Sequence, residues 1–301
     1  MPIKVDNNLP AKRILEDENI FIMDEGRAIT QDIRPLEILI LNLMPIKEDT
    51  EVALMRALSN TPLQVNINFM TTESYVGHTT PKSHLDKFYI NIEDVKDKKF
   101  DGLIVTGAPV EQLPYEDVVY WNELSYIFDW SKDHVTSSIF ICWGAMAGLY
   151  HFYGIDKYDL PKKLFGIYAH HVYERKVPLV RGFDDIFYAP HSRHTSVRRE
   201  DIEREPNLTI LAESEEAGVF LCMSNDSSRI FVLGHPEYDR MTLDKEYRRD
   251  KAKGLPIDIP VNYYPGDDPD KRPILSWRAH ANTFYTNWLN YYVYQNTPYR
   301  L

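Results

Sequence analysis

The sequence predicts an α/β fold, in which a mostly parallel sheet carries helices on both faces. In residues 36–154, short apolar runs typical of buried strands alternate with segments whose apolar residues recur at helical spacing. Strands that alternate with helices build parallel sheets, and functional groups gather at the carboxyl ends of such strands. From about residue 165 the strand candidates follow one another with fewer helices between them, so we expect the second half to be more antiparallel.

The first half contains four predicted strand–helix pairs. The strands are expected at 36–43, 62–70, 100–107 and 136–143, and the helices that follow them at 48–60, 81–89, 115–134 and 143–154. The first strand is a nearly continuous apolar run, which is typical of burial inside a sheet. An aromatic stripe along residues 115–134 is interpreted as core packing and not as a cofactor site.

The second half combines strand candidates with a charged helix and an aromatic one. We expect strands at 166–174, 186–197, 208–214, 218–224 and 229–237, a charged helix at 239–254, a turn-rich loop at 262–273 and an aromatic helix at 276–295. No glycine–serine or proline-rich linker divides the halves, so residues 1–301 are predicted to form a single domain. Within it, residues 1–35 are an N-terminal extension, and residues 36–301 are the core with an elaborated C-terminal part.

Composition narrows the possible classes of function. The 301 residues include 34 Lys and Arg against 45 Asp and Glu, and a net charge of −11 argues against a nucleic-acid partner. The two cysteines, Cys142 and Cys222, fit neither a disulfide framework nor a zinc spacing, so we expect a reducing, cytoplasmic setting. Neither a secretion signal nor an apolar run long enough for a bilayer is apparent, so we expect no membrane association.

Cys142 lies where a predicted strand turns directly into a helix, in the segment FICWGAMAGLYHFYG (140–154). Free backbone N–H groups and the helix dipole favour an anion at a helix N-terminus, so a cysteine there ionises more readily. The N–H of Trp143 can point at the same space and contribute to an oxyanion hole. Cys142 is therefore a candidate nucleophile, although an unpaired cysteine is also commonly an inert core residue.

His235 and Glu237 end a predicted strand in the segment RIFVLGHPEYD (229–239). Pro236 favours an extended conformation for His235, and residues two apart in an extended chain project to the same side. The carboxylate of Glu237 can then hold one imidazole nitrogen, which leaves the other free to accept a proton. Taken alone, a histidine at a strand end is more often structural. The combination with Cys142 predicts a nucleophile, a base and an orienting carboxylate at one end of a sheet.

The motifs around these residues resemble two related groups. CWG at 142–144 with HPE at 235–237 resembles class I glutamine amidotransferases, although Phe140 replaces the first glycine of their G-x-C-x-G elbow. A broader resemblance, to the homoserine O-acyltransferases of methionine biosynthesis, rests on NLMPIK (42–47), TGAPVE (106–111), CWGAMAGLYHFYG (142–154), APHSRHT (189–195), GHPEYD (234–239) and NYYPGDDP (262–269). It implies a flavodoxin-like, class I glutamine amidotransferase-like α/β fold.

This resemblance implies a two-step acyl transfer. Cys142 would accept an acyl group from acyl-coenzyme A as a thioester, and His235 with Glu237 would complete the triad. Homoserine's hydroxyl is a poor nucleophile until His235 removes its proton. The expected partners are thus L-homoserine and acyl-coenzyme A as co-substrate, with no tightly bound cofactor, and the family suggests a homodimer.

Binding roles are implied for further positions. The resemblance points to Lys163, Ser192 and Arg249 as substrate-binding residues, and the planar guanidinium of Arg249 suits the α-carboxylate of homoserine. Spacing alone instead favours Arg249 as part of a solvated helix face. Lys47 ends the NLMPIK motif, where it either lines the site or begins the next helix. The backbone of Leu43 is a candidate second oxyanion donor.

The resemblance also implies that Glu111 sets the choice of acyl donor, because in that family this position helps separate acetyl from succinyl donors. It follows the third strand's TGAPV loop and should face the acyl pocket, where glycine would leave room for a succinyl tail. Glutamate fills that room and repels the terminal carboxylate of the tail, at a cost on the order of a few kcal/mol. Acetyl-coenzyme A is therefore the predicted donor, with succinyl-coenzyme A as the alternative. An exposed loop carboxylate is the other interpretation of Glu111.

Two other features of the sequence, its paired histidines and its second cysteine, carry no predicted chemistry. His170, His171, His191 and His194 do not form a recognisable ligand set, because neighbouring histidines point to opposite sides of a strand, so no metal site is predicted. Cys222 lies in the middle of a predicted strand and is expected to be inert. A glutaminase-type hydrolase and a non-catalytic metabolite-binding relative remain as competing functions.

Overall fold

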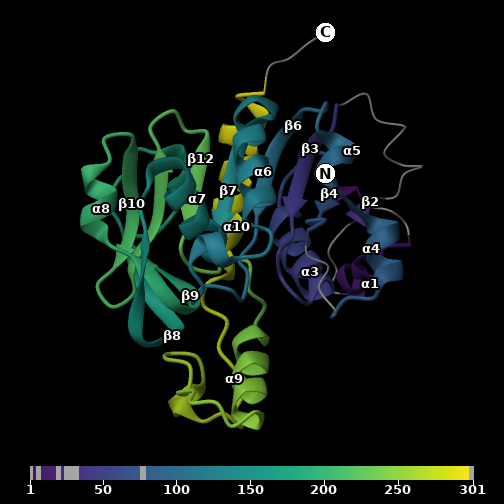
Figure 1. Ribbon diagram of the computed structural model, residues 1–301. Helices are drawn as coiled ribbons and strands as arrows, with labels where there is room; N and C mark the ends of the chain where they lie inside the picture. Colours follow the sequence, from purple (N-terminus) through teal and green to yellow (C-terminus); the bar gives the residue numbers. More distant parts are fainter. Residues whose placement is uncertain (1–2, 5–7, 18–21, 24–33, 75–78, 298–301) are drawn as a thin grey trace.

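The computed structural model describes residues 3–4, 8–17, 22–23, 34–74 and 79–297. Its strands are β1 (Ile3–Lys4), β2 (Ile22–Met23), β3 (Leu36–Leu41), β4 (Val65–Met70), β5 (Tyr89–Ile90), β6 (Phe100–Val105), β7 (Val135–Ile141), β8 (Lys157–Val172), β9 (Ile186–Val197), β10 (Leu208–Ser214), β11 (Gly218–Ser224) and β12 (Arg229–Val232). These described strands form one sheet in the order β2-β1-β4-β3-β6-β7-β12-β11-β10-β8-β9, with β5 paired to β4 (Figure 1). The predicted α/β class is confirmed.

Helices cover both faces of this sheet. They are α1 (Pro10–Asp17), α3 (Lys47–Leu58), α4 (Lys82–Phe88), α5 (Ile92–Val95), α6 (Trp121–His134), α7 (Trp143–Tyr153), α8 (Arg199–Arg204), α9 (Thr242–Ala252) and α10 (Arg278–Asn287). Apolar residues of α1, α3 and α10 share one core with one face of the sheet. Those of α6 and α7 share a second core with the other face.

The first half of the sheet is parallel because its strands are joined through these helices. β3 pairs in parallel with β4 and β6, β6 with β7, and β7 with β12. Along β3, Ile38 and Ile40 enter one core while Leu39 and Leu41 enter the other. Burial on both faces explains the continuous apolar run that predicted this strand. The carboxyl ends of β3, β6, β7 and β12 therefore meet at one edge.

The second half of the sheet is antiparallel, as expected. β8 and β9 form a long two-stranded ladder, and β10 connects β8 to β11. A third, smaller apolar cluster includes Phe165 and Ile167 of β8, Leu243 and Tyr247 of α9, and Trp277. This cluster fixes α9 beside the β8–β9 ladder, at the bottom of Figure 1.

Several predicted elements differ in detail. β8 begins at Lys157 and not at 166, and β12 ends at Val232 and not at 237. Helix α6 begins at Trp121 and not at 115, since Tyr115–Asp117 form a short 3-10 turn after Pro114 and the Tyr115 ring stacks on Tyr150 at 4.4 Å. The C-terminal aromatic helix changes after α10 into a π-helical segment, Trp288–Tyr294. The N-terminal extension contributes β1, β2 and α1, whose Leu15 is fully buried.

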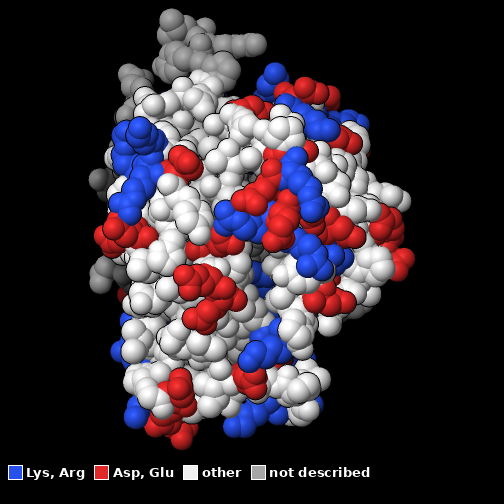
Figure 2. Space-filling view, turned by 90° about the vertical axis from the view of Figure 1, so that its left-hand side faces the viewer, with Lys and Arg blue, Asp and Glu red and all other residues white. Residues whose placement is uncertain are grey.

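The surface mixes charges of both signs. On the face shown in Figure 2, acidic and basic side chains lie next to one another, in keeping with ion pairs such as Arg199–Glu203 and Arg204–Asp201 of α8. Screened pairs of this kind on a surface contribute little stability. Among the described residues, no helix is long and apolar enough to span a membrane.

Candidate active site

Cys142 occupies a strained corner between β7 and α7. Its backbone has φ 52° and ψ −114°, which an L-residue with a side chain rarely adopts. The Cys142 N–H donates to the carbonyl of Val232 in β12 (2.7 Å), and its carbonyl accepts from the Met146 N–H in the first turn of α7 (3.1 Å). Sheet and helix together thus hold the corner in a nucleophile-elbow geometry.

The turn also depends on Gly144. A Cβ built at this position would lie 2.6 Å from the carbonyl oxygen of Thr106 and 3.0 Å from that of Val105. Both are backbone atoms of β6 and its loop, so they cannot move aside as a flexible side chain would. Glycine lets α7 begin directly against β6, which brings Cys142 to the carboxyl edge of the sheet.

His235 and Glu237 follow β12, the neighbour of β7. His235 Nδ1 lies 2.7 Å from Glu237 Oε1, and the backbone N–H of His235 donates to the carbonyl of Pro190 (2.8 Å). Both side chains are buried, and the imidazole stacks on the ring of Tyr238 with centroids 4.1 Å apart. The carboxylate therefore orients the ring so that Nε2 is the nitrogen open to a reaction partner.

The side chains of Cys142 and His235 both lie next to Gly107. A Cβ built on Gly107 would lie 3.4 Å from Cys142 Cβ and 3.6 Å from His235 Cε1. Burial lowers the pKa of His235, but negative charge on the Cys142 sulfur and on Glu237, with hydrogen bonds to both, raises it well above 6.5. The imidazole is thus held between Glu237 and Cys142, with its pKa raised by both neighbours.

Three of the four predicted substrate-binding residues, Lys163, Ser192 and Arg249, converge on two carboxylates of α9. Lys163 Nζ lies 3.5 Å from Glu246 Oε2 and 3.6 Å from Asp250 Oδ2, while Ser192 Oγ donates to Glu246 Oε2 (2.5 Å). Arg249 Nε donates to Asp250 Oδ1 at 2.7 Å, and its side chain is 52% exposed. These groups form a patch with charges of both signs, the pattern needed for an amino-acid zwitterion.

Tyr238 links this patch to the imidazole. Its hydroxyl donates to Glu246 Oε1 (2.9 Å), while its ring stacks on His235. Burial, followed by the negative charges of Glu246 and Glu237, raises the pKa of Tyr238 well above 10, so it stays a donor at neutral pH. Neither Tyr238 nor Glu246 was among the predicted site residues. Glu246 was missed because a carboxylate in a charged helix pattern resembles a solvated one.

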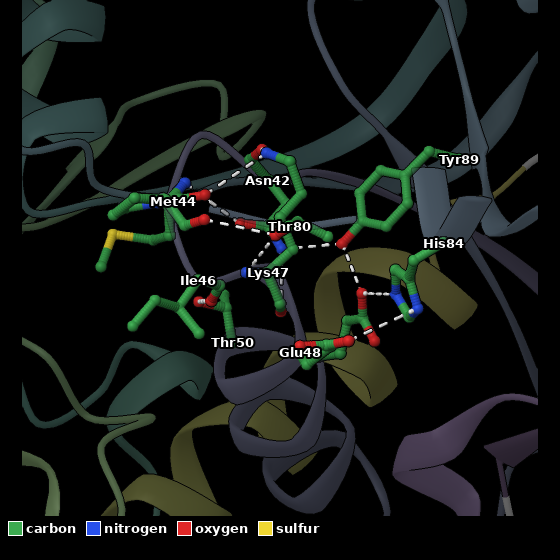
Figure 3. Close-up of polar contacts among 11 residues, drawn as sticks. Asn42, Met44, Ile46, Lys47, Glu48, Thr50, Thr80, His84 and Tyr89 are labelled. Atoms are coloured by element: carbon green, nitrogen blue, oxygen red, sulfur yellow. Dashed lines mark hydrogen bonds and ion pairs between the residues drawn. The ribbon is translucent and has the colours of Figure 1, made fainter. Parts of the chain in front are cut away.

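Lys47 both begins α3 and turns its side chain inward. Its Nζ lies 2.5 Å from the carbonyl oxygen of Asn42 and 3.3 Å from that of Met44, and Figure 3 shows it pointing back toward this loop. Burial lowers the pKa of Lys47 to about 8, although Glu51 opposes the shift. The buried ammonium thus fastens the loop that follows β3.

A buried polar network of hydrogen bonds lies next to Lys47 (Figure 3). Glu51 Oε1 accepts from the hydroxyl of Tyr89 (2.7 Å) and lies 2.8 Å from His84 Nε2. The amide of Asn42 donates to the same Tyr89 hydroxyl (2.9 Å), so the network reaches the loop after β3 (Figure 3). Interconnected buried hydrogen bonds of this kind rigidify their surroundings.

Glu111 lies against β9. Its Oε2 accepts from the backbone N–H of His194 (2.9 Å) and is 3.4 Å from Thr195 Oγ1, which in turn is 3.4 Å from Met146 Sδ in the first turn of α7. The carboxylate is therefore half-buried near the start of α7 and does not extend freely into solvent.

Arg193 is a fully buried cation that sequence reasoning missed. Its guanidinium donates to the carbonyls of Thr195 (2.9 Å) and Ala217 (2.6 Å), and no carboxylate of the described residues forms an ion pair with it. Burial lowers the pKa of Arg193, and the negative charges of Cys142 and Glu111 counteract that shift. Its position in the alternating pattern of a strand gave no sign that it would be buried.

The two proposed oxyanion donors, the backbone N–H groups of Trp143 and Leu43, differ in their hydrogen bonding. Trp143 follows Cys142 as the first residue of α7, where the N–H groups of a helix lack intrahelical acceptors. The Leu43 N–H instead donates to Thr106 Oγ1 (2.8 Å). In this structure Leu43 is thus engaged, whereas the backbone of Gly107 borders both Cys142 and His235.

The remaining histidines and the second cysteine lie apart from this chemistry. His170 and His191 form a buried pair, with Nε2 atoms 2.9 Å apart, and burial lowers the pKa of His170 to about 3. Across the described part of the chain, no group of three or more His, Cys, Asp or Glu side chains could hold a metal ion. Cys222 is fully buried, which raises the pKa of its thiol.

Comparison with known proteins places the chain. A family model described as homoserine O-succinyltransferase matches residues 2–299. The chain is 67% identical to a homoserine O-acetyltransferase of Lachnoclostridium phytofermentans, with all of both chains covered. It is 60% identical to one of Geobacillus kaustophilus, with 99% of each covered.

Solved structures agree on the fold. A glutamine amidotransferase of Thermotoga maritima superimposes with a TM-score of 0.56 at 11% identity, covering 85% of this chain and 98% of that one. One of Methylobacillus flagellatus gives 0.52 at 13% identity, covering 86% and 95%. The fold is thus that of class I glutamine amidotransferases, and the chain belongs to the homoserine O-succinyltransferase family.

Proposed function

We propose that this protein transfers the acetyl group of acetyl-coenzyme A to the hydroxyl of L-homoserine, through a thioester on Cys142. The observation that carries the proposal is the meeting of Cys142 and His235 at Gly107, with Glu237 behind the imidazole. Family membership and the names of the curated relatives supply the substrates. The product would be O-acetyl-L-homoserine, a precursor for methionine biosynthesis.

In the first half-reaction the Cys142 thiolate attacks the thioester carbonyl of the donor. Negative charge develops on the carbonyl oxygen, where the Trp143 N–H at the start of α7 is suited to receive it. The second donor is Leu43, if its N–H leaves Thr106, or the backbone of Gly107. The bond to the coenzyme sulfur breaks, and the His235 imidazolium gives its proton to the departing thiolate.

The second half-reaction uses a change in the charge of the site. Acylation removes the negative charge from the Cys142 sulfur, which is one cause of the raised pKa of His235. The pKa then falls, and the neutral imidazole can take the proton of the homoserine hydroxyl as it attacks the thioester. When the Cys142–acyl bond breaks, the thiolate and the imidazolium are restored together.

Homoserine fits the mixed-charge patch of Lys163, Ser192, Glu246, Arg249 and Asp250. Its ammonium would take the place beside Glu246 that the Lys163 ammonium now occupies. Its carboxylate would bind Lys163 or the half-exposed guanidinium of Arg249. Its hydroxyl would then extend toward His235, because Tyr238 connects Glu246 to the imidazole.

Acetyl is the proposed acyl group because Glu111 stands beside α7. Its half-buried carboxylate would repel the terminal carboxylate of a succinyl group. Succinyl-coenzyme A is the alternative donor, in line with the description of the family model.

We also propose that the protein is a cytoplasmic homodimer and requires no tightly bound cofactor, metal or nucleic acid. Sedimentation of the purified protein tests the dimer.

The direct test is intact-protein mass spectrometry after incubation with acetyl-coenzyme A. The unaltered protein and Cys222→Ala should gain one acetyl group, which homoserine then removes, whereas Cys142→Ala should gain none. A gain that survives Cys142→Ala would exclude the covalent route. Hydrolysis of glutamine without turnover of acyl-coenzyme A would instead favour a glutaminase.

A further inference from the structure

A cavity of about 260 Å³ lies at the carboxyl ends of β3, β4 and β6. Its wall is largely apolar and includes Met44, Pro109, Val110 and Leu113. A few polar side chains interrupt it, among them Asn42 and Thr72. Ligand sites in open α/β sheets are found at this edge, and sites for organic ligands are mostly apolar with a few placed polar groups.

The cavity is continuous with the loops that shape the nucleophile's corner. One wall is the loop after β3, which Lys47 fastens from within, and another is the loop after β6. The Leu43 N–H joins these two loops through Thr106 Oγ1 (2.8 Å), and the carbonyl of Thr106 lies against Gly144 beside Cys142. A molecule in this cavity therefore borders the loop after β6, whose Gly107 lies next to Cys142.

We propose that this cavity binds the pantetheine arm of the acyl-coenzyme A donor. The proposal rests on the proposed function. The arm is uncharged and carries a gem-dimethyl group, a hydroxyl and two amides, which match apolar walls interrupted by hydroxyl and amide side chains. An acyl thioester held in this way enters from the β3–β6 side of Cys142.

The opposite side of Cys142 is suited to the other substrate. Glu246 and Asp250 of α9, with Lys163 of β8, lie next to the antiparallel half of the sheet and offer charges to an amino acid. The cavity by β3, β4 and β6 has Asp117 and Lys47 in its wall, but the Lys47 ammonium is turned to backbone carbonyls. Donor and acceptor thus reach the sulfur from different sides.

A larger cavity of about 490 Å³ fits the arm less well. It is lined by four arginines and one aspartate, namely Arg56, Arg240, Arg272, Arg278 and Asp239. Guanidinium groups in this number attract anions, whereas the arm has no charge. At the smaller cavity, Leu113 (45% exposed) and Val119 (72%) remain open to solvent. A ligand that covered these apolar side chains would remove their surface from water, which favours binding.

The test compares two donors. Acetyl-coenzyme A contains the whole arm, while S-acetyl-N-acetylcysteamine keeps the thioester and only one amide. Val110→Trp narrows the cavity and should raise the KM for acetyl-coenzyme A at least tenfold, with the kcat/KM for the short donor changed less than twofold. Ile186→Trp, an equally bulky change at a half-exposed position of β9, should alter neither.

Leu113→Glu provides a second variant that is safe for folding, because the position is already half-exposed. It should weaken binding of free coenzyme A in calorimetry and spare the short donor. Equal losses with both donors, or no loss with either variant, would overturn the assignment of the cavity while leaving the transferase activity in place. Absence of any acetyl transfer by the unaltered protein would reject both the proposed function and this site.

Discussion

The parallel and antiparallel halves of the sheet contribute to the site in different ways. The parallel half fixes Cys142 through backbone geometry: a positive φ, a hydrogen bond to Val232 and the close approach of Gly144 to Thr106. The antiparallel half and α9 contribute side-chain charges, such as Lys163 and Glu246. The comparison indicates that backbone geometry positions Cys142, while side-chain charges surround the patch proposed for homoserine.

The largest effect should come from the residue that orients the imidazole. We expect Glu237→Gln to lower kcat by about 10²–10⁴-fold, since the ring loses its orientation and the pKa of His235 loses one of the charges that raise it. The rate at which iodoacetamide alkylates Cys142, measured as a function of pH, should show that the His235 imidazolium loses its proton at a lower pH than in the unaltered protein. An unchanged pH profile would contradict the proposed role.

The sign of the pH effect on stability follows from the same shift. Because the folded pKa of His235 is raised, its ion pair stabilises the fold fully below the unfolded pKa near 6.5, and this contribution is lost as pH rises through the folded pKa. In Glu237→Gln the loss should occur at lower pH. Urea unfolding at several pH values from about 6 to 9, a range that starts near the ordinary pKa of imidazole and extends above it, checks this.

Two glycines sharpen the comparison between the halves. Gly144→Ala places a methyl group 2.6 Å from a backbone carbonyl and should cost about 3 kcal/mol in the free energy of unfolding. Gly218→Ala, in the antiparallel half, meets no atom within 4 Å and should cost about 1 kcal/mol for its positive φ alone. Equal urea midpoints for the two variants would refute a special constraint at the corner.

A charge of the antiparallel half should affect binding more than chemistry. Glu246→Gln keeps the size of the side chain but removes the partner proposed for the homoserine ammonium, so the KM for homoserine should rise about 10–30-fold. Acylation of Cys142 by acetyl-coenzyme A should proceed at nearly its normal rate. Stopped-flow acylation and steady-state kinetics separate the two steps, and a loss of acylation would place Glu246 in the donor half of the site.

The smallest effect expected is on the choice of donor. Glu111→Gly should raise the kcat/KM ratio of succinyl- to acetyl-coenzyme A by about tenfold, since a carboxylate near α7 is removed. Glu111→Gln is the matched control, because it fills the same space without the charge and so separates repulsion from bulk. If neither variant shifts the ratio, Glu111 does not select the donor.

The sequence was informative where local patterns carry the structure. Strands such as β3 were predicted because burial on both faces leaves an apolar run, and Cys142 because a strand turned directly into a helix. Buried charges gave no such signal. Arg193 and Glu246 occur in patterns that look like solvated faces, and only the packing of β9 and α9 buries Arg193 fully and leaves the Glu246 side chain 14% exposed. The same limit explains why Tyr115 was placed in a helix, although it lies in a 3-10 turn before α6 and its ring stacks on Tyr150.

Gly107 offers a practical tool, since its missing side chain leaves open the space that faces both Cys142 and His235. A Cβ there would be in ordinary contact with each, at 3.4 and 3.6 Å, so Gly107→Ala is compatible with the fold. The added methyl would nonetheless occupy the volume in which a tetrahedral adduct must form. Such a variant is a candidate trap for crystallography, able to retain an intact donor that the active protein would consume.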